Sequence, residues 1–360
     1  MPTATNGIVY TDKLASAALA NIEAAVVLSG TVQKHPDSDF TGAAGHVVNI
    51  RRPSILNGFQ EGIDDGSPAG SRTIKTESLN EQVLPIKLDQ HVYSAIDLSD
   101  AELSLGVEDF TGQVVMPQTE AIVNRMERVV ASAFAEFPEA EAIEIEVDDN
   151  DRPANGDYVN AAQQIRFAIS QLSARLTAQN VPVAGRYLVL GSTVAGWLMN
   201  DPNLTDASAA GSDSALRESV IGKLHGFTLL QDNRVEPLGL YAYHTSAIQL
   251  VTRAPVVPAG GVAAGTSSAE GGYALRWIRD YNSSTASERS FLSTYVGVTV
   301  LKDATRDKDG KVVVDGQGSP VQSVIRGLRS KLVLTKQAPE QPEKPEDQET
   351  FKSGAKSAKK

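Results

Sequence analysis

The sequence predicts an α+β fold, and three stretches carry that prediction. Residues 81–97 alternate apolar and polar side chains with a period close to two, which is typical of a strand with one solvated face. Residues 109–137 repeat apolar side chains at spacings of three, four and seven, which indicates one stripe of a long helix. Residues 157–252 alternate helical and strand patterns, which indicates a separate domain of mixed structure.

The composition limits the classes of function. With 360 residues, 41% hydrophobic and 21% charged, the chain resembles an ordinary folded protein that can bury a large core. The absence of cysteine excludes disulfides, thiolate metal sites and cysteine nucleophiles. No apolar run approaches the roughly 18 residues of a membrane-spanning helix, and the first residues lack the pattern of a signal peptide. The net charge of −11 argues against a dedicated nucleic-acid binder, although it permits a protein that encloses DNA without gripping it.

The first half of the chain is predicted to contain an arm and a polar excursion. Residues 12–33 indicate a helix that ends at Gly30, and residues 34–45 a loop. A strand over 46–53 stops at its proline. The stretch 54–82 is rich in turn signals and too polar to form a hydrophobic core of its own. We therefore expect it to pack against another surface, such as a second subunit.

The long helix is predicted to begin near Asp109, a good N-cap residue. It would form a rod of about 40 Å. Pro117 lies inside this stretch, so we expect a kink or a later start near residues 113–117. Its core side should be the stripe of Ile122, Met126, Val129, Val130 and Ala133. The opposite, mainly solvated side should carry Gln118, Glu120, Asn124, Arg125, Glu127 and Arg128.

The second half alternates helices and strands before it turns to longer strands. The patterns predict an edge-like strand over 139–147, an amphipathic helix over 158–176, a buried strand over 186–190 and a helix that Ser192 opens and caps. Three short strands follow, and then long strands over 273–280 and 291–301, a hairpin over 302–320, and a last strand or short helix over 321–334. Residues 337–360 are predicted to be disordered.

Candidate chemistry is sparse. The five histidines show no zinc spacing. Ser192 lacks the flanking glycines of a nucleophile elbow, so helix capping explains it better. The acidic turn that follows Val147 lacks the spacing and terminal glutamate of an EF-hand, so a solvated turn is favoured over a cation site. The sequence therefore predicts no catalytic, cofactor-binding or metal-ligating residue, and no enzyme.

The order of these elements resembles the major capsid proteins of tailed bacteriophages with the Hong Kong 97 fold. Three local sequences are similar to those of phages of actinobacteria: 45–53 before the excursion, 109–118 at the start of the long helix, and 186–191 in the mixed domain. The resemblance implies an N-terminal helix and arm (1–45), a strand pair with an extended E-loop (46–97, with the loop at about 54–82), a P-domain with a spine helix (98–156), an A-domain (157–255), a linker and return strands of the P- and A-domains (256–336), and a disordered tail (337–360).

The resemblance also implies a function in assembly. Many copies would form hexamers and pentamers of the icosahedral shell of a tailed double-stranded DNA phage, built in the host cytoplasm and carried in the virion. The E-loop would lie over a neighbouring subunit through Ile55, Leu56, Phe59, Ile63, Arg72 and Lys75.

The implied partners are other copies of the chain, a portal, a possible decoration protein and DNA enclosed without specific binding. A separate scaffolding protein is also expected, because only about ten residues precede the first predicted helix. No membrane partner is expected. An encapsulin-type cellular compartment is the alternative, and a hydrolase built on residues 157–252 is a more distant one.

Overall fold

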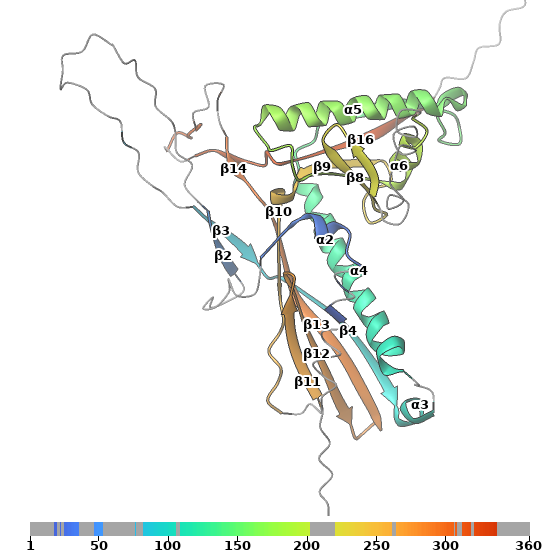
Figure 1. The fold of residues 1–360 in the computed structure, drawn as a ribbon, viewed down its shortest axis with the longest axis vertical. Helices are drawn as coiled ribbons and strands as arrows, with labels where there is room; N and C mark the ends of the chain where they lie inside the picture. Colours follow the sequence, from blue (N-terminus) through green and yellow to red (C-terminus); the bar gives the residue numbers. More distant parts are fainter. Residues whose placement is uncertain are drawn as a thin grey trace, which may run out of the picture.

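Two six-stranded sheets and one long helix form the framework of the molecule (Figure 1). This computed structural model describes residues 18–19, 22, 25–35, 47–52, 76, 82–105, 109–201, 220–260, 264–305, 307, 312–317 and 320–336. The predicted E-loop at 54–82 lies almost wholly outside the described residues, and the predicted tail at 337–360 lies entirely outside them.

The first sheet is called here the β13 sheet, and its strands β4, β11, β12 and β13 are labelled in the lower half of Figure 1. Its strands run in the order β1 (Gln33–His35), β10 (Ile248–Arg253), β13 (Ser287–Val300), β12 (Tyr273–Asn282) and β11 (Ala264–Glu270). The strand β4 (Gln90–Ser99) also pairs antiparallel with β13, from Ser99 opposite Ser287 to Gln90 opposite Val296. Long alternating strands therefore build a sheet with two distinct faces.

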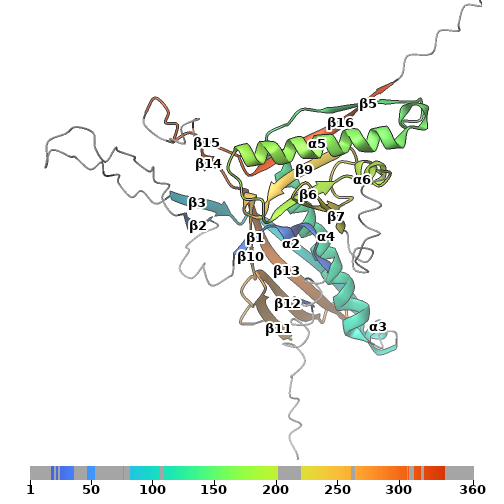
Figure 2. The ribbon, with the colours of Figure 1, turned by 45° about the horizontal axis from the view of Figure 1, so that its top comes forward.

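The second sheet, called here the β16 sheet, has one face covered by a long helix (Figure 2). Its order is β5 (Ile143–Val147), β16 (Gly327–Lys336), β9 (Gly239–His244), β6 (Arg186–Leu190), β8 (Phe227–Gln231) and β7 (Val220–Leu224). The covering helix is α5 (Tyr158–Ala178), and the shorter α6 (Ser192–Leu198) joins the same core. The apolar stripe of α5 is buried against the central strands through Ile165, Ile169, Leu172 and Leu176.

The predicted spine helix consists of three consecutive segments. A π-helical turn at Thr111–Val115 leads into α4 (Met116–Ala133), and a 3-10 turn at Phe134–Glu136 ends it. The Asp109 carboxylate accepts a hydrogen bond of 3.0 Å from the Thr111 amide, as an N-cap does. Pro117 lies in the first turn of α4. Backbone amides in the first turn make no hydrogen bond within the helix, so the missing amide hydrogen of proline costs nothing there. The irregularity predicted near 113–117 is thus present, in the form of the π-helical turn.

The predicted stripe of α4 lies in the core between this helix and the β13 sheet. Ile122, Met126, Val130 and Ala133 are buried, and Val129 is half-buried against the same cluster. Across from them lie Val92, Leu292 and Val296. Burial of each large apolar side chain contributes about 1.5–3 kcal/mol relative to exposure. At the far end of the helix, the Phe134 ring stacks on Tyr241 with centroids 5.0 Å apart, which connects α4 to the β16 sheet.

The N-terminal arm ends differently from the prediction. The short helix α2 (Leu28–Thr31) continues past Gly30, and Lys34 and His35 belong to β1 and not to a loop. The strand β1 pairs parallel with β10, and the pairing joins Gln33 to Gln249. A partner more than 200 residues away along the chain is a tertiary contact that a local turn signal cannot show.

Two predicted domain boundaries also change. The strand β5, assigned to the P-domain at 98–156, belongs to the β16 sheet, where it pairs parallel with β16. The strand β10, assigned to the A-domain at 157–255, belongs to the β13 sheet. Alternation of apolar side chains identifies a strand without naming its neighbour, and in both cases the neighbour is distant in sequence. The alternatives left open for 321–334 are also resolved, because this stretch contains the strands β15 (Gln322–Ser323) and β16.

The remaining elements are small. The strands β2 (Val47–Arg52) and β3 (Gln82–Lys87) form an antiparallel pair at the base of the predicted E-loop. The strand β14 (Asp303–Ala304) pairs with β15, and α3 (Asp100–Leu105) follows β4. Short 3-10 turns occupy Ala154–Gly156 and Thr245–Ala247. Among the described residues, no helix has both the length and the apolar character needed to cross a membrane.

Candidate functional site

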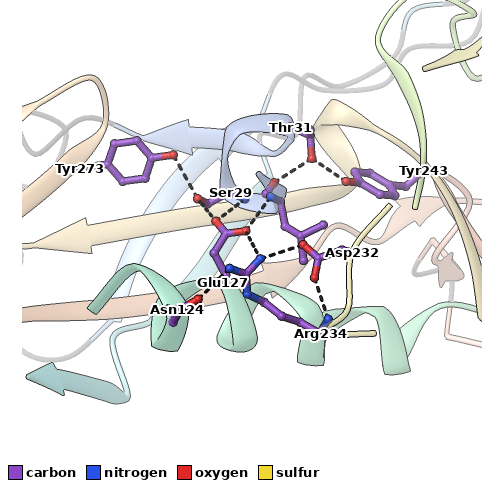
Figure 3. A network of polar contacts seen from close by, with 9 residues as sticks. Ser29, Thr31, Asn124, Glu127, Asp232, Arg234, Tyr243 and Tyr273 are labelled. Carbon is purple, nitrogen blue, oxygen red and sulfur yellow. Dashed lines mark hydrogen bonds and ion pairs between the residues drawn. The ribbon is translucent and has the colours of Figure 1, made fainter. Parts of the chain in front are cut away.

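A buried carboxylate joins the arm, the long helix and both sheets (Figure 3). Glu127 is fully buried, although Glu120 and Arg128 on the same helix are exposed. The Leu28 amide donates to its Oε2 over 2.6 Å, and the Ser29 amide donates to its Oε1 over 3.0 Å. The Ser29 hydroxyl donates to the same Oε1. The carboxylate therefore accepts hydrogen bonds from the backbone amides at the start of α2, which have no partner within that helix, and so holds α2 against α4.

A guanidinium group completes the environment of this carboxylate. Arg234, in the loop after β8, lies with Nη1 3.8 Å from Glu127 Oε2 and 2.9 Å from Asp232 Oδ2. Its Nη2 donates to Asn124 Oδ1 over 2.8 Å. One arginine thus ties the loop of the β16 sheet to α4 and balances buried negative charge, which a carboxylate in the interior requires.

Two tyrosines extend the contacts into the sheets. The Tyr273 hydroxyl, from β12, donates to Ser29 Oγ over 3.2 Å. The Tyr243 hydroxyl, from β9, lies 2.5 Å from Thr31 Oγ1. Complete burial raises the pKa of the Tyr243 phenol, so this side chain stays neutral at physiological pH. We call this set the polar junction: Ser29, Thr31, Asn124, Glu127, Asp232, Arg234, Tyr243 and Tyr273.

The polar junction was not predicted from the sequence. Glu127 was expected on the solvated side of the helix together with Gln118, but both are buried. Gln118 donates to the carbonyl oxygen of Ser290 over 3.0 Å and accepts from the Ser290 hydroxyl over 2.7 Å. Glu127 directly follows Met126 of the apolar stripe, which is the one local sign that it borders the core. The burial arises because α2 and the loop after β8 cover this side of α4.

The other face of the β13 sheet carries exposed rings. His91 and Tyr93 of β4 lie beside Phe291 and Tyr295 of β13, and we call these four residues the aromatic patch. Ring centroids are 5.0 Å apart for His91 and Tyr295 and 5.7 Å apart for Tyr93 and Phe291. Tyr93 is 61% exposed and Tyr295 is 38% exposed. The patch alternates along each strand with the residues that face α4, as the pleat of a strand requires.

Cationic groups surround the aromatic patch. The Arg276 guanidinium lies 5.6 Å from the centroid of the Phe291 ring, in a cation–π arrangement. Beside the patch is a groove of about 910 Å³, whose charged lining residues are Lys87, Asp89, Arg253 and Arg276. Burial, and after it the charge of Arg276, lower the pKa of His91, so this imidazole is mainly neutral at pH 7. Apolar rings and excess positive charge make this surface suited to an apolar, acidic partner.

The groove reaches the base of the predicted E-loop. Val47 and Lys87, which are paired across β2 and β3, are among its lining residues. The six predicted contact residues of the loop lie outside the described residues: Ile55, Leu56, Phe59, Ile63, Arg72 and Lys75.

The structure also places the serine and the acidic and histidine side chains that were considered for chemistry. Ser192 is exposed and is the first residue of α6, while Gly191 occupies the N-cap position. The predicted capping role of Ser192 is therefore wrong, because the turn places the cap one residue earlier. Within the part of the chain that the structure describes, no three His, Asp or Glu side chains gather as metal ligands would.

Comparison with known proteins identifies the fold. No protein-family model matches the sequence, and no curated protein matches it. The solved structure described as Mycobacterium phage Che8 is 17% identical, with a TM-score of 0.51 over 85% of this chain and 90% of that chain. The capsid structure of the cyanophage P-SCSP1u is 12% identical, with a TM-score of 0.51 over 84% of this chain and 90% of that chain. The fold is that of phage capsid proteins, which confirms the predicted α+β class of the Hong Kong 97 type.

Proposed function

We propose that this chain is the major capsid protein of a tailed double-stranded DNA bacteriophage and assembles with copies of itself into an icosahedral shell. The observation that carries the proposal is the fold likeness to a phage capsid structure over 84% of this chain and 90% of that chain. A likeness of this extent concerns the whole subunit and not one domain of it.

The aromatic patch supports a role in subunit contact. Exposed rings that adjoin one another are uncommon on a protein that remains monomeric. The predicted E-loop offers the matching chemistry, because its apolar Leu56, Phe59 and Ile63 are interspersed with Glu61 and Asp64. Such a segment from a neighbouring copy would place apolar side chains on the rings and carboxylates near Arg276 and Arg253 of the patch and its groove.

The charge of the chain supports containment of DNA without specific binding. A net charge of −11 gives the chain an overall repulsion for phosphates, so packaged DNA would not be held tightly by a wall of such subunits. The proposal assigns the chain a structural role and no catalysis. It further includes a separate scaffolding protein and a portal during assembly in the host cytoplasm, with a decoration protein as an optional outer partner.

Microscopy of the purified protein tests the proposal. The full chain, expressed alone and then with the products of its neighbouring genes, is passed over a sizing column and viewed in negative stain. We expect closed shells or rings of capsomers tens of nanometres wide. A monomer under all salt conditions, with those gene products supplied, would refute the assembly function. Shells that enclose a co-purified enzyme would identify an encapsulin-type compartment instead.

Removal of the predicted E-loop tests which segment makes the contacts. A chain without residues 57–80 should fold, because β2 and β3 remain paired at its base, but should fail to form shells. Circular dichroism and the urea midpoint check the fold, and the shell fraction on the sizing column gives the effect. A deletion in the hairpin after β14, which lies on a different sheet, provides the control. Shells at normal yield from the 57–80 deletion would contradict the E-loop assignment.

A further inference from the structure

An open groove runs along the β16 sheet between α5 and the edge strand β5. It consists of two adjoining hollows of about 540 and 470 Å³, which share Glu144, Asn160 and Gln164 in their walls. Glu141 and Arg175 lie at one end of the groove, and Thr335 of β16 lies at the other. None of the residues of the polar junction or the aromatic patch lines it.

The groove is polar and acidic, with one exposed ring. Carboxamide groups come mainly from α5, and carboxylates mainly from the β5 strand and its approach. The carboxamide and carboxylate residues of the lining are Glu141, Glu144, Glu146, Asn155, Asp157, Asn160, Gln163, Gln164 and Gln171. Phe167 of α5 also lines it and is 66% exposed, although a phenylalanine normally gains from burial. Arg175 is the one cation among the described lining residues, and it pairs with Glu141 over 3.6 Å. A basic segment with one apolar ring would fit these walls.

The β5 side of the groove is an open sheet edge. Among the described strands, β5 pairs with β16 alone, so its other side presents backbone groups over Ile143–Glu146. Exposed edges of this kind invite pairing with another chain, and proteins protect them by charge or by cover. Glu144 and Glu146 are exposed and supply charge. No described strand other than β16 pairs with β5, and a single bridge joins its last residue, Val147, to Pro153.

The chain itself continues from this place. Lys336, the last residue of β16, is paired with Val147 of β5, and the preceding Thr335 lines the groove. Residues 337–350 contain five acidic residues, three prolines and one lysine. Residues 351–360 contain four lysines and no acidic residue, and they begin with Phe351, the first aromatic residue after β16.

We propose that residues 351–360 bind in the α5–β5 groove of their own subunit and cover the open edge of β5. The Phe351 ring packs on Phe167, and the lysines pair with Glu141, Glu144 and Glu146. The acidic stretch 337–350 is repelled by the groove and acts as a spacer, which can span up to about 45 Å when extended. The groove follows α5, which is about 32 Å long, so the spacer reaches all of it. This inference concerns the single subunit and does not rest on the proposed capsid function.

Hydrogen exchange in the full chain tests the proposal. Exchange of the β5 amides at 143–147 is compared between the full chain and a chain without residues 351–360, at low salt. We expect the outward-facing amides of β5 to exchange at least about tenfold faster in the shortened chain, and the difference to shrink at 0.5 M salt because the contact is ionic. A cooperative urea transition in each chain shows that both are folded, and the midpoint of the shortened chain should be slightly lower because the contact is lost. Equal exchange of β5 in the two folded chains would overturn the proposal.

Matched variants locate the contact. Phe167→Ser in the groove and Phe351→Ala in the segment should each increase β5 exchange as the deletion does. Met199→Ser, at an exposed apolar side chain just after α6, is the control and should leave it unchanged. A peptide of residues 349–360, added to the shortened chain, should restore protection of β5 and lose this effect with Phe167→Ser. If the peptide restores protection of β5 equally well in the Phe167→Ser variant, the segment binds elsewhere. If protection in the full chain depends on protein concentration, the segment binds to another subunit. Either result refutes the proposal as stated.

Discussion

The polar junction and the aromatic patch lie on opposite faces of the β13 sheet, which α4 covers on one side. They differ in burial: the junction is enclosed by the subunit, and the patch is exposed. In the junction, Glu127 is fully buried, its oxygens accept hydrogen bonds from Leu28 and Ser29, and it forms an ion pair with Arg234 of the same chain. In the patch, Tyr93 and Tyr295 remain exposed, and the ring of each lies beside His91. The junction therefore completes the subunit, whereas the patch is a surface that a second molecule can complete. Mutations in the two should separate folding from assembly.

The largest effect on stability is expected at the junction. Glu127→Ala leaves the buried amides of Leu28 and Ser29 without an acceptor and Arg234 without part of its countercharge. The free energy of unfolding should fall by about 3–5 kcal/mol. Urea unfolding followed by circular dichroism measures it. Glu120→Ala, at an exposed position of the same helix, is the control and should change stability by less than about 0.5 kcal/mol. Equal losses in the two variants would contradict a structural role for Glu127.

The patch should show the reverse behaviour. The double variant Tyr93→Ser with Tyr295→Ser removes two exposed rings and should lower the yield of shells at least about tenfold, a change of about 1.4 kcal/mol in association. The urea midpoint of the subunit should stay nearly unchanged. Tyr281→Ser is the control, since Tyr281 is 51% exposed and lies outside the patch. Normal shell yield from the double variant would exclude the patch as a contact surface.

A smaller loss of stability is expected when one hydroxyl of the junction is removed. Tyr273→Phe removes the hydroxyl that donates to Ser29 Oγ over 3.2 Å and leaves the ring in place. We expect a loss of about 1 kcal/mol, typical of one internal hydrogen bond, with shell formation intact. Tyr281→Phe removes an exposed bond of 3.1 Å to Asp100 and should cost less. If Tyr273→Phe instead prevents shell formation, the junction acts in assembly and the distinction between the two regions fails.

The smallest effect is a pH dependence of the patch. The pKa of His91 lies below its ordinary value near 6.5 because burial and Arg276 disfavour the imidazolium. The unfolded chain therefore binds this proton more readily, and His91 lowers stability as pH falls from above 6.5 through its folded pKa. The urea midpoint of the wild type should decrease slightly more over this window than that of His91→Gln. An identical pH profile for the two proteins would show that His91 does not contribute.

The elements with strong local patterns were predictable, whereas the neighbours of those elements were not. The stripe of α4 and the helix α5 are visible as apolar periodicity, and Asp109 and Pro117 carry recognisable end signals. The pairing of β5 with β16 and of β1 with β10 joins residues far apart in sequence. No local pattern encodes such pairings, since alternation states only that a strand has two faces.

The polar junction and the aromatic patch were not predictable for the same reason, because both depend on neighbours distant in the sequence. The burial of Glu127 depends on α2 and on Arg234, both remote from α4 along the chain. The sequence pattern of this helix by itself therefore predicts that Glu127 is exposed to solvent. The aromatic patch was hidden for a related reason. His91 and Tyr93 look like ordinary exposed strand residues until β13 places Phe291 and Tyr295 beside them.

The position of β16 also sets the order in which the molecule can be completed during synthesis. This strand lies between β5 and β9, yet it is the last strand of the described chain to be made. Until the ribosome has passed Lys336, β5 lacks its described strand partner, β9 is paired only on its β6 side, and the β16 sheet is incomplete. Pairings this distant form slowly and late. A nascent chain therefore cannot complete the β16 sheet before β16 itself has been translated.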